Sequence, residues 1–99
     1  MNMQSLMAQA QKMQRDLTKK KEEIDNTIFT GESEWVTVEM NGKKELKNIK
    51  IKFEGTIEED DKEALEDMIK IAVNNATVKI DKEIESKMGG YGSALNGLF

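Results

Sequence analysis

Three positively charged side chains near the start of the chain are spaced for contact with a row of phosphates. Lys12, Arg15 and Lys19 are three and four residues apart, so in a helix they lie within about 60° of one another. Cations aligned in this way can each neutralise one phosphate of a nucleic acid. A charged outer face is also what an ordinary surface helix presents, and Asp16 and Glu23 flank the three cations. We call Lys12, Arg15 and Lys19 the basic ridge, and its spacing leaves both interpretations open.

Lysines also gather at two later places in the chain. Five of them follow an Asn-Gly pair: Lys43, Lys44, Lys47, Lys50 and Lys52. Lysine on an exposed strand is also a common protection against aggregation. Lys79, Lys82 and Lys87 occur in the last turns of a predicted helix, where positive charge also suits the helix dipole. By spacing alone, these later lysines define no coherent face.

The residues that most catalytic mechanisms need are missing. The sequence contains neither His nor Cys, which removes cysteine nucleophiles, thiolate zinc sites and disulfides. Its serines stand outside any G-x-S-x-G nucleophile motif, and no Gly-rich phosphate loop joins a strand to a helix. The acidic run Glu58–Asp61 lacks the spacing of a calcium loop and suits the start of a helix better. We therefore expect no enzymatic activity, no metal and no cofactor.

Composition bounds the remaining possibilities. A chain of 99 residues, of which 37% are hydrophobic, makes one small core that self-association would help to bury. Such a core leaves little room for a small-molecule cavity. A formal charge of −4 disfavours bulk attraction to nucleic acid or to anionic lipid, so any such binding needs a local patch. No segment has the pattern of a signal peptide or a membrane span, so we expect a cytoplasmic protein with no membrane partner.

The basic ridge belongs to one long amphipathic helix, predicted from about Met3 to Asn26. At the usual rise per residue this helix would be about 36 Å long, which is more than one small core needs. Its apolar residues share one third of the helix circumference, opposite the ridge: Met3, Leu6, Met7, Ala10, Met13, Leu17 and Ile24. Such a Met-rich stripe could be an adaptable binding surface, but it more often lies in a core or between two chains. We expect the first six residues of this stripe, from Met3 to Leu17 and without Ile24, to form a homodimer interface.

From Thr27 onward the hydrophobic pattern changes to the alternation of β-strands. We expect strands near Ile28–Ser33, Trp35–Met40 and Lys44–Phe53. The Asn41-Gly42 pair predicts a hairpin between the last two, because both residues tolerate the positive φ of a tight two-residue turn.

The third predicted strand contains an irregularity. Ile49, Ile51 and Phe53 share one face, whereas Leu46 has the opposite parity. A β-bulge near Lys47-Asn48 would bring Leu46 to the same face.

Helical spacing returns after the acidic run and continues from Leu65 to Ile84. The order is therefore a long N-terminal helix, a three-stranded antiparallel sheet and a C-terminal helix, which is an α+β fold. We expect residues 1–88 to form a single domain and residues 89–99 to be a flexible Gly-rich tail.

In this order, the segments resemble the YbaB/EbfC family of nucleoid-associated proteins over nearly the whole chain. The resemblance rests on the succession "LMAQAQKMQ", "TGES", "VTVEMNG", "LKNIKI" and "DDKEALEDMIKIAVNNA", followed by a Gly-rich end. Members of the family usually have a Gly-rich link after "TGES", where this chain has only Glu34 and Trp35. Ile28 to Met40 could therefore also be one bent strand.

The resemblance implies a tweezer-like homodimer with projecting helices, non-enzymatic DNA binding, and roles in nucleoid organisation and gene regulation. It transfers no particular contact residues. From the charges we select these DNA-binding candidates: Lys12, Arg15, Lys19, Lys20, Lys79 and Lys82. The predicted function is binding to the backbone of duplex DNA with little sequence preference. The alternative is an interaction module whose amphipathic helices clasp another protein without contacting DNA.

Overall fold

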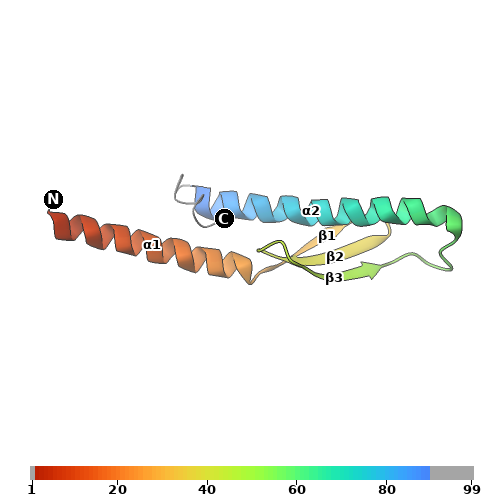
Figure 1. Ribbon diagram of the computed structural model, residues 1–99, viewed down its shortest axis with the longest axis horizontal. Helices are drawn as coiled ribbons and strands as arrows, with labels where there is room; N and C mark the ends of the chain where they lie inside the picture. The colour runs from red at the N-terminus through yellow and green to blue at the C-terminus, as the bar shows by residue number, and fades with distance from the viewer. Residues whose placement is uncertain (1, 90–99) are drawn as a thin grey trace.

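One long helix covers a small antiparallel sheet and a second long helix extends from one end of the sheet, which makes the molecule elongated (Figure 1). The structure, a computed structural model, describes residues 2–89. The elements are α1 (Met3–Asp25), β1 (Ile28–Glu32), β2 (Val36–Asn41), β3 (Leu46–Ile51), the 3-10 helix η1 (Glu59–Asp61) and α2 (Lys62–Met88). The predicted α+β class and element order are confirmed. Most of the predicted tail lies outside the described residues.

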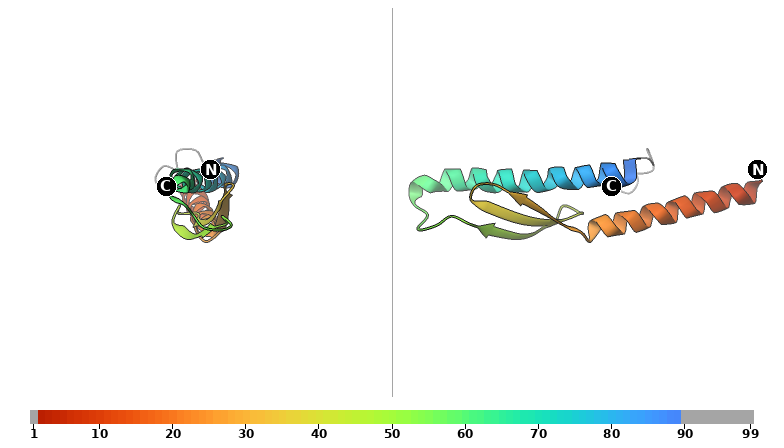
Figure 2. Two further views of the ribbon diagram at one scale, coloured as in Figure 1. Left: turned by 90° about the vertical axis from the view of Figure 1, so that its right-hand side faces the viewer. Right: turned by 180° about the vertical axis from the view of Figure 1, so that it is seen from behind.

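Within residues 2–89, helix α1 packs on the rest of the molecule through its second half. Asn2 caps its start, because the Asn2 side chain accepts a hydrogen bond from the Ser5 N–H at 2.8 Å. Leu17 and Ile24 are buried together with Met88 of α2. The first turns of α1 extend beyond the body, and the molecule measures 70 × 18 × 16 Å as a result (Figures 1 and 2).

The sheet has the order β1-β2-β3 with antiparallel neighbours. A tight turn separates β1 from β2, with the Ser33 N–H donating to the Val36 carbonyl at 2.8 Å, so the single bent strand is excluded. Asn48 pairs with Glu39, whereas Met40 pairs with Leu46. Lys47 is therefore the extra residue of a β-bulge, which confirms the predicted irregularity.

The β2–β3 hairpin is confirmed, but its predicted turn was wrong. The Asn41 N–H donates to the Glu45 carbonyl at 3.0 Å, so three residues form the loop, and the positive φ of 66° belongs to Lys44. The strand β3 therefore begins at Leu46, later than predicted. Gly42 has a different role, because a Cβ there would lie 2.0 Å from the Ile24 carbonyl oxygen. The hairpin loop thus lies directly against the end of α1.

The core lies between α2 and the first two strands. Its fully buried residues come from β2 and from one face of α2: Val36, Val38, Met40, Ala72, Ala76 and Ile80. Gly31 of β1 permits this close approach, since a Cβ there would lie 2.0 Å from the Ala72 carbonyl oxygen. Figure 2 shows α2 running along this face of the sheet.

The acidic run opens the second helix, as predicted. Glu59–Asp61 form the short η1 immediately before α2. The Glu58 N–H donates to the Asp61 carboxylate at 2.9 Å, which satisfies one of the backbone donors at the helix start.

Candidate nucleic-acid interface

Positive and negative charges are separated along the long axis of the molecule. Residues 3–21 of α1 contain five cations and one acid, whereas residues 54–67 contain eight acids and one lysine. The first segment lies at one end of the molecule and the second at the other (Figure 1). A chain of net charge −4 therefore has a positive end that can approach phosphate groups.

The basic ridge lies on the exposed side of α1. Leu17 and Ile24 face α2, and helical spacing puts the ridge on the opposite side. Arg15 and Lys19 line a hollow of α1 together with one acid, Glu22, and with the uncharged Gln11, Gln14 and Thr18. Within residues 2–89, no ion pair engages Lys12, Arg15 or Lys19. Their charges are therefore available to an anionic partner.

The other selected lysines lie together on a different surface. Lys20 lines a hollow between the two helices with Glu83 and Lys87, and Lys79 and Lys82 line a neighbouring hollow that also includes Glu83. We call Lys20, Lys79, Lys82 and Lys87 the border cluster. The structure thus brings the three selected lysines together, in hollows whose linings do not include the basic ridge.

The border cluster includes one lysine that was not selected from the sequence. The Lys87 Nζ lies 3.8 Å from the Glu83 carboxylate. The side chain of Lys87 is 60% exposed and that of Glu83 is 37% exposed, so solvent screens this ion pair. Lys79 also has a structural contact, because its Nζ donates to the Thr30 carbonyl at 2.6 Å. The only sequence signal for Lys87 was its place in the last turns of a predicted helix. Its proximity to Lys20 depends on the packing of α1 on α2.

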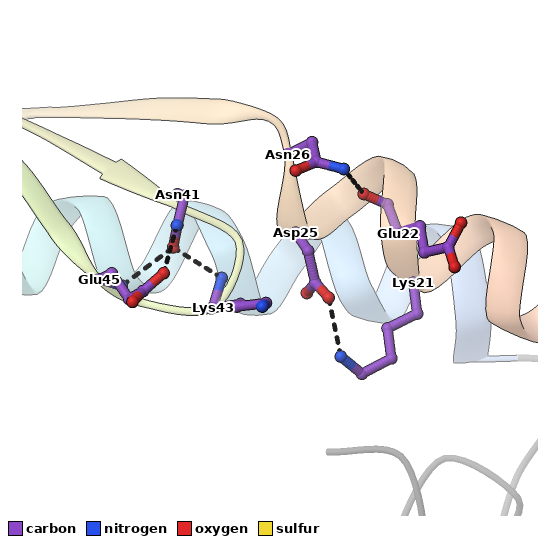
Figure 3. A network of polar contacts seen from close by, with 7 residues as sticks. All are labelled: Lys21, Glu22, Asp25, Asn26, Asn41, Lys43 and Glu45. Carbon is purple, nitrogen blue, oxygen red and sulfur yellow. Dashed lines mark hydrogen bonds and ion pairs between the residues drawn. The ribbon is translucent and has the colours of Figure 1, made fainter.

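A polar network at the base of α1 fixes the hairpin loop (Figure 3). The Asn41 side-chain oxygen accepts hydrogen bonds from the backbone N–H groups of Lys43 and Glu45, both at 3.0 Å. Its amide nitrogen donates to the Glu45 carboxylate at 2.7 Å. This hydrogen bond, together with the nearby Lys47, lowers the pKa of the Glu45 carboxyl.

The end of α1 meets this loop. Asp25 is buried and forms an ion pair with Lys21, one turn earlier in the helix (Figure 3). The Lys21 Nζ lies 2.8 Å from the Asp25 Oδ2. The close approach of Gly42 to Ile24 sets the position of the loop against the helix. The direction in which α1 presents the basic ridge is therefore fixed at its base.

Comparison with known proteins relates this chain to a family. A model of the YbaB/EbfC DNA-binding family matches residues 1–95. The chain belongs to this family. It is similar to nucleoid-associated proteins of three bacterial species. The identity is 45% with the protein of Lactococcus lactis subsp. lactis, over 96% of this chain and 97% of the relative.

Two other relatives also match over nearly the whole chain. The identity is 40% with the nucleoid-associated protein of Ligilactobacillus salivarius, over 99% of this chain and 95% of the relative. It is 38% with that of Enterococcus faecalis, over 97% of this chain and 93% of the relative. The YbaB/EbfC resemblance seen in the sequence is confirmed, and with it the assignment to a DNA-binding family.

The predicted dimer stripe of this YbaB/EbfC chain is divided by the fold. Met3, Leu6, Met7, Ala10 and Met13 are exposed, as an interface with another chain requires. Leu17 is instead buried within the single chain against α2. The role of the stripe in a homodimer stays a prediction.

Residues 2–89 contain neither a metal-binding cluster nor a membrane-spanning helix. In this part of the chain, no group of three or more potential ligand side chains could hold a metal ion. None of its helices is both long enough and apolar enough to cross a membrane.

Proposed function

We propose that this YbaB/EbfC protein binds the phosphate backbone of duplex DNA as a homodimer with little sequence preference. In the cytoplasm it would contribute to nucleoid organisation and gene regulation. The observation that supports this best is the projecting helix α1, whose cations outnumber its acids five to one over residues 3–21 in a chain of net negative charge. Lysine and arginine contacts to phosphate position a protein on DNA without reading its sequence.

The charge separation also favours one orientation on DNA. The segment 54–67 should be repelled by phosphate, because its acids outnumber its lysines eight to one. The end that contains α1 would therefore approach the duplex first. We propose the basic ridge as the principal contact, with Lys20, Lys79 and Lys82 of the border cluster as secondary contacts.

The salt dependence of binding tests this proposal. Neutralised phosphates release counterions, so affinity should fall linearly with salt on logarithmic axes. If two copies of the three ridge residues each contact one phosphate, replacing all three by Ala should flatten the slope by about 5. Mobility shifts at a series of salt concentrations measure it.

A matched variant controls for the loss of overall charge. Replacing Lys52, Lys62 and Lys70 by Ala removes the same charge from the acidic half of the molecule and should leave the slope nearly unchanged. An unchanged slope in the ridge variant would contradict the ridge assignment. Shuffled DNA sequences should bind within a few-fold of one another, and a strong preference would contradict backbone binding.

The second candidate function is a protein-interaction module, which the exposed Met-rich stripe of α1 favours. It predicts no mobility shift even at low salt, and a partner protein whose capture is lost when Met7 is replaced by Lys. The homodimer is tested separately by light scattering, in which a mass near 11.2 kDa at micromolar concentration would refute it.

A further inference from the structure

The apolar stripe of α1 is uncovered over the first half of the helix. In the described part of the chain, its four large side chains there are 47–73% exposed. From Met3 to Arg15 the only charged residues are Lys12 and Arg15, which belong to the basic ridge on the opposite side of the helix. The exposed part of the stripe is therefore uncharged. We call it the free stripe, and its residues are Met3, Leu6, Met7, Ala10 and Met13.

A projecting helix of this length needs a partner for its apolar side. The first turns of α1 extend beyond the body of the molecule, and its buried residues begin only at Leu17 (Figure 1). Isolated helices of fewer than about 12–15 residues are marginal in water, and most helical stability in proteins comes from packing of the apolar face. A segment that covers the free stripe would therefore stabilise the part of α1 that contains Lys12 and Arg15.

The end of α2 lies beside this stripe. Met88 is fully buried and packs in one cluster with Leu17 and Ile24 of α1. Leu17 follows Met13 by one turn on the same side of α1, so the surface that Met88 covers continues directly into the free stripe. At its end, α2 also points toward the start of α1 (Figures 1 and 2). The chain therefore leaves the described residues next to the free stripe and in its direction.

Residues 90–99 have a length and a composition that suit the free stripe. Their sequence, GYGSALNGLF, contains no charge, so packing on an uncharged stripe would bury no charged group. The helix rises about 21 Å between Leu17 and Met3, whereas ten residues span at most about 33 Å, so this segment can reach the whole stripe. Its large apolar side chains are Tyr91, Leu95, Leu98 and Phe99.

We propose that residues 90–99 cover the free stripe of their own chain. This inference goes beyond the DNA binding proposed above, because the free stripe and the basic ridge lie on opposite sides of α1. The covered helix is stabilised while Lys12, Arg15 and Lys19 remain accessible to phosphate. A partner protein, or the stripe of a second copy, could bind this side of α1 only by displacing the segment.

Covalent connection favours this segment over a second copy. A group joined by a short linker has an effective concentration of about millimolar at a neighbouring site, which is about a thousandfold above that of a second copy in a micromolar solution. Burial of Met88 against Leu17 also fixes the start of the segment beside the stripe, which lowers the entropy lost when the segment packs.

Paramagnetic broadening in NMR spectra measures this contact. The chain has no cysteine of its own, so Ser93→Cys takes a single nitroxide label within the segment. We expect the backbone amide signals of Leu6, Ala10 and Met13 to lose most of their intensity, compared with the same sample after chemical reduction of the nitroxide. Unchanged intensities would overturn the inference.

Two lysine variants of the labelled protein show whether the contact uses the stripe. Met7→Lys places a charge within the free stripe and should restore the lost intensities. Ala8→Lys is the matched control, because Ala8 is the next residue, is exposed and lies by helical spacing on the side of the basic ridge. It should leave the signals broadened. Recovery in both variants, or in neither, would overturn the inference.

Mixed samples distinguish the segment of the same chain from that of a second copy. Isotope-labelled chains without nitroxide are combined with an excess of spin-labelled chains at natural isotope abundance, so that a homodimer pairs mostly one of each with the other. We expect no broadening of the free-stripe signals in this mixture. Broadening would assign the contact to a second copy and overturn the inference. No DNA is present, so the result is independent of the proposed function.

Hydrogen exchange gives a second measurement that needs no label. Leu95→Lys places a charge among the apolar residues of the segment. We expect the backbone amides of residues 6–13 to exchange several-fold faster in this variant, because this part of α1 then opens more often. Asn96→Lys adds the same charge at the next residue and should leave the rates close to those of the wild type. Equal rates in Leu95→Lys and the wild type would overturn the inference.

Discussion

Replacing Gly31 by Ala should test how closely β1 and α2 are packed. The new Cβ would lie 2.0 Å from the Ala72 carbonyl oxygen and 2.6 Å from the Ala76 nitrogen, whereas ordinary contact begins near 3.4 Å. Both neighbours are backbone atoms, so no side chain can rotate away. The helix would have to move by more than one ångström, which would loosen its packing on Val36 and Val38.

The expected loss of stability has two parts. Overpacking of a well-packed core costs about 1–3 kcal/mol. Moving α2 also weakens the hydrogen bonds from Asn75 and Lys79 to β1, each worth about 1 kcal/mol. The free energy of unfolding should therefore fall by about 3–5 kcal/mol, which lowers the Tm by roughly 15–30 °C for a domain of this size.

Two other glycines supply graded controls in thermal melts followed by circular dichroism. Gly89→Ala should be nearly neutral, because its Cβ would meet only the Glu85 side chain at 3.8 Å. Gly55→Ala meets no atom within 4 Å but has φ of +88°, so it should cost about 1–2 kcal/mol from the left-handed backbone alone. All variants are compared at one protein concentration, since dimerisation makes the Tm concentration-dependent. A Gly31→Ala variant that melts within a few degrees of wild type would refute this account of the packing.

Two further predictions concern hydrogen bonds that position the elements. Asn41→Ala should lower the free energy of unfolding by about 1–3 kcal/mol, because it removes bonds to Lys43 and Glu45; urea titration measures this, and a loss below about 0.5 kcal/mol would contradict it. The same variant should raise the pKa of the Glu45 carboxyl toward its ordinary value, as seen by NMR titration. Because the folded pKa of Glu45 is lowered, its stabilisation is present above the ordinary glutamate pKa and is lost as pH falls through the lowered value. Ser33→Ala should cost about 1 kcal/mol, since the hydroxyl donates to the Met68 carbonyl, and equal urea midpoints for the variant and wild type would show that this bond is unimportant.

The spacing of apolar residues along the chain was sufficient to predict the helices and the β-bulge of this fold. The spacing of apolar residues predicts both helices, because a helix that packs on one side must repeat its apolar residues every three or four positions. Parity predicts the bulge at Lys47, because an apolar residue of the wrong parity reaches the core side only through an extra residue. These relations involve neighbours in the chain and need no knowledge of the tertiary structure.

The turn between β2 and β3 shows where local pattern is insufficient. Asn41-Gly42 predicts the hairpin, yet the left-handed residue is Lys44. The small size of Gly42 instead accommodates the carbonyl of Ile24 at the end of α1. A contact between segments distant in sequence therefore determines how this glycine is used.

By itself, the sequence determined the α+β order, the aligned cations of the ridge and the family. Only the tertiary structure decided that Leu17 is buried within one chain, that Lys20 lies near Lys87, and that the apolar face of β3 is uncovered. Alternation shows which residues of a strand share a face, but not whether a helix reaches that strand. In this protein the width of α2 and its hydrogen bonds to β1 decide the matter, because they leave room for the helix on only two of the three strands.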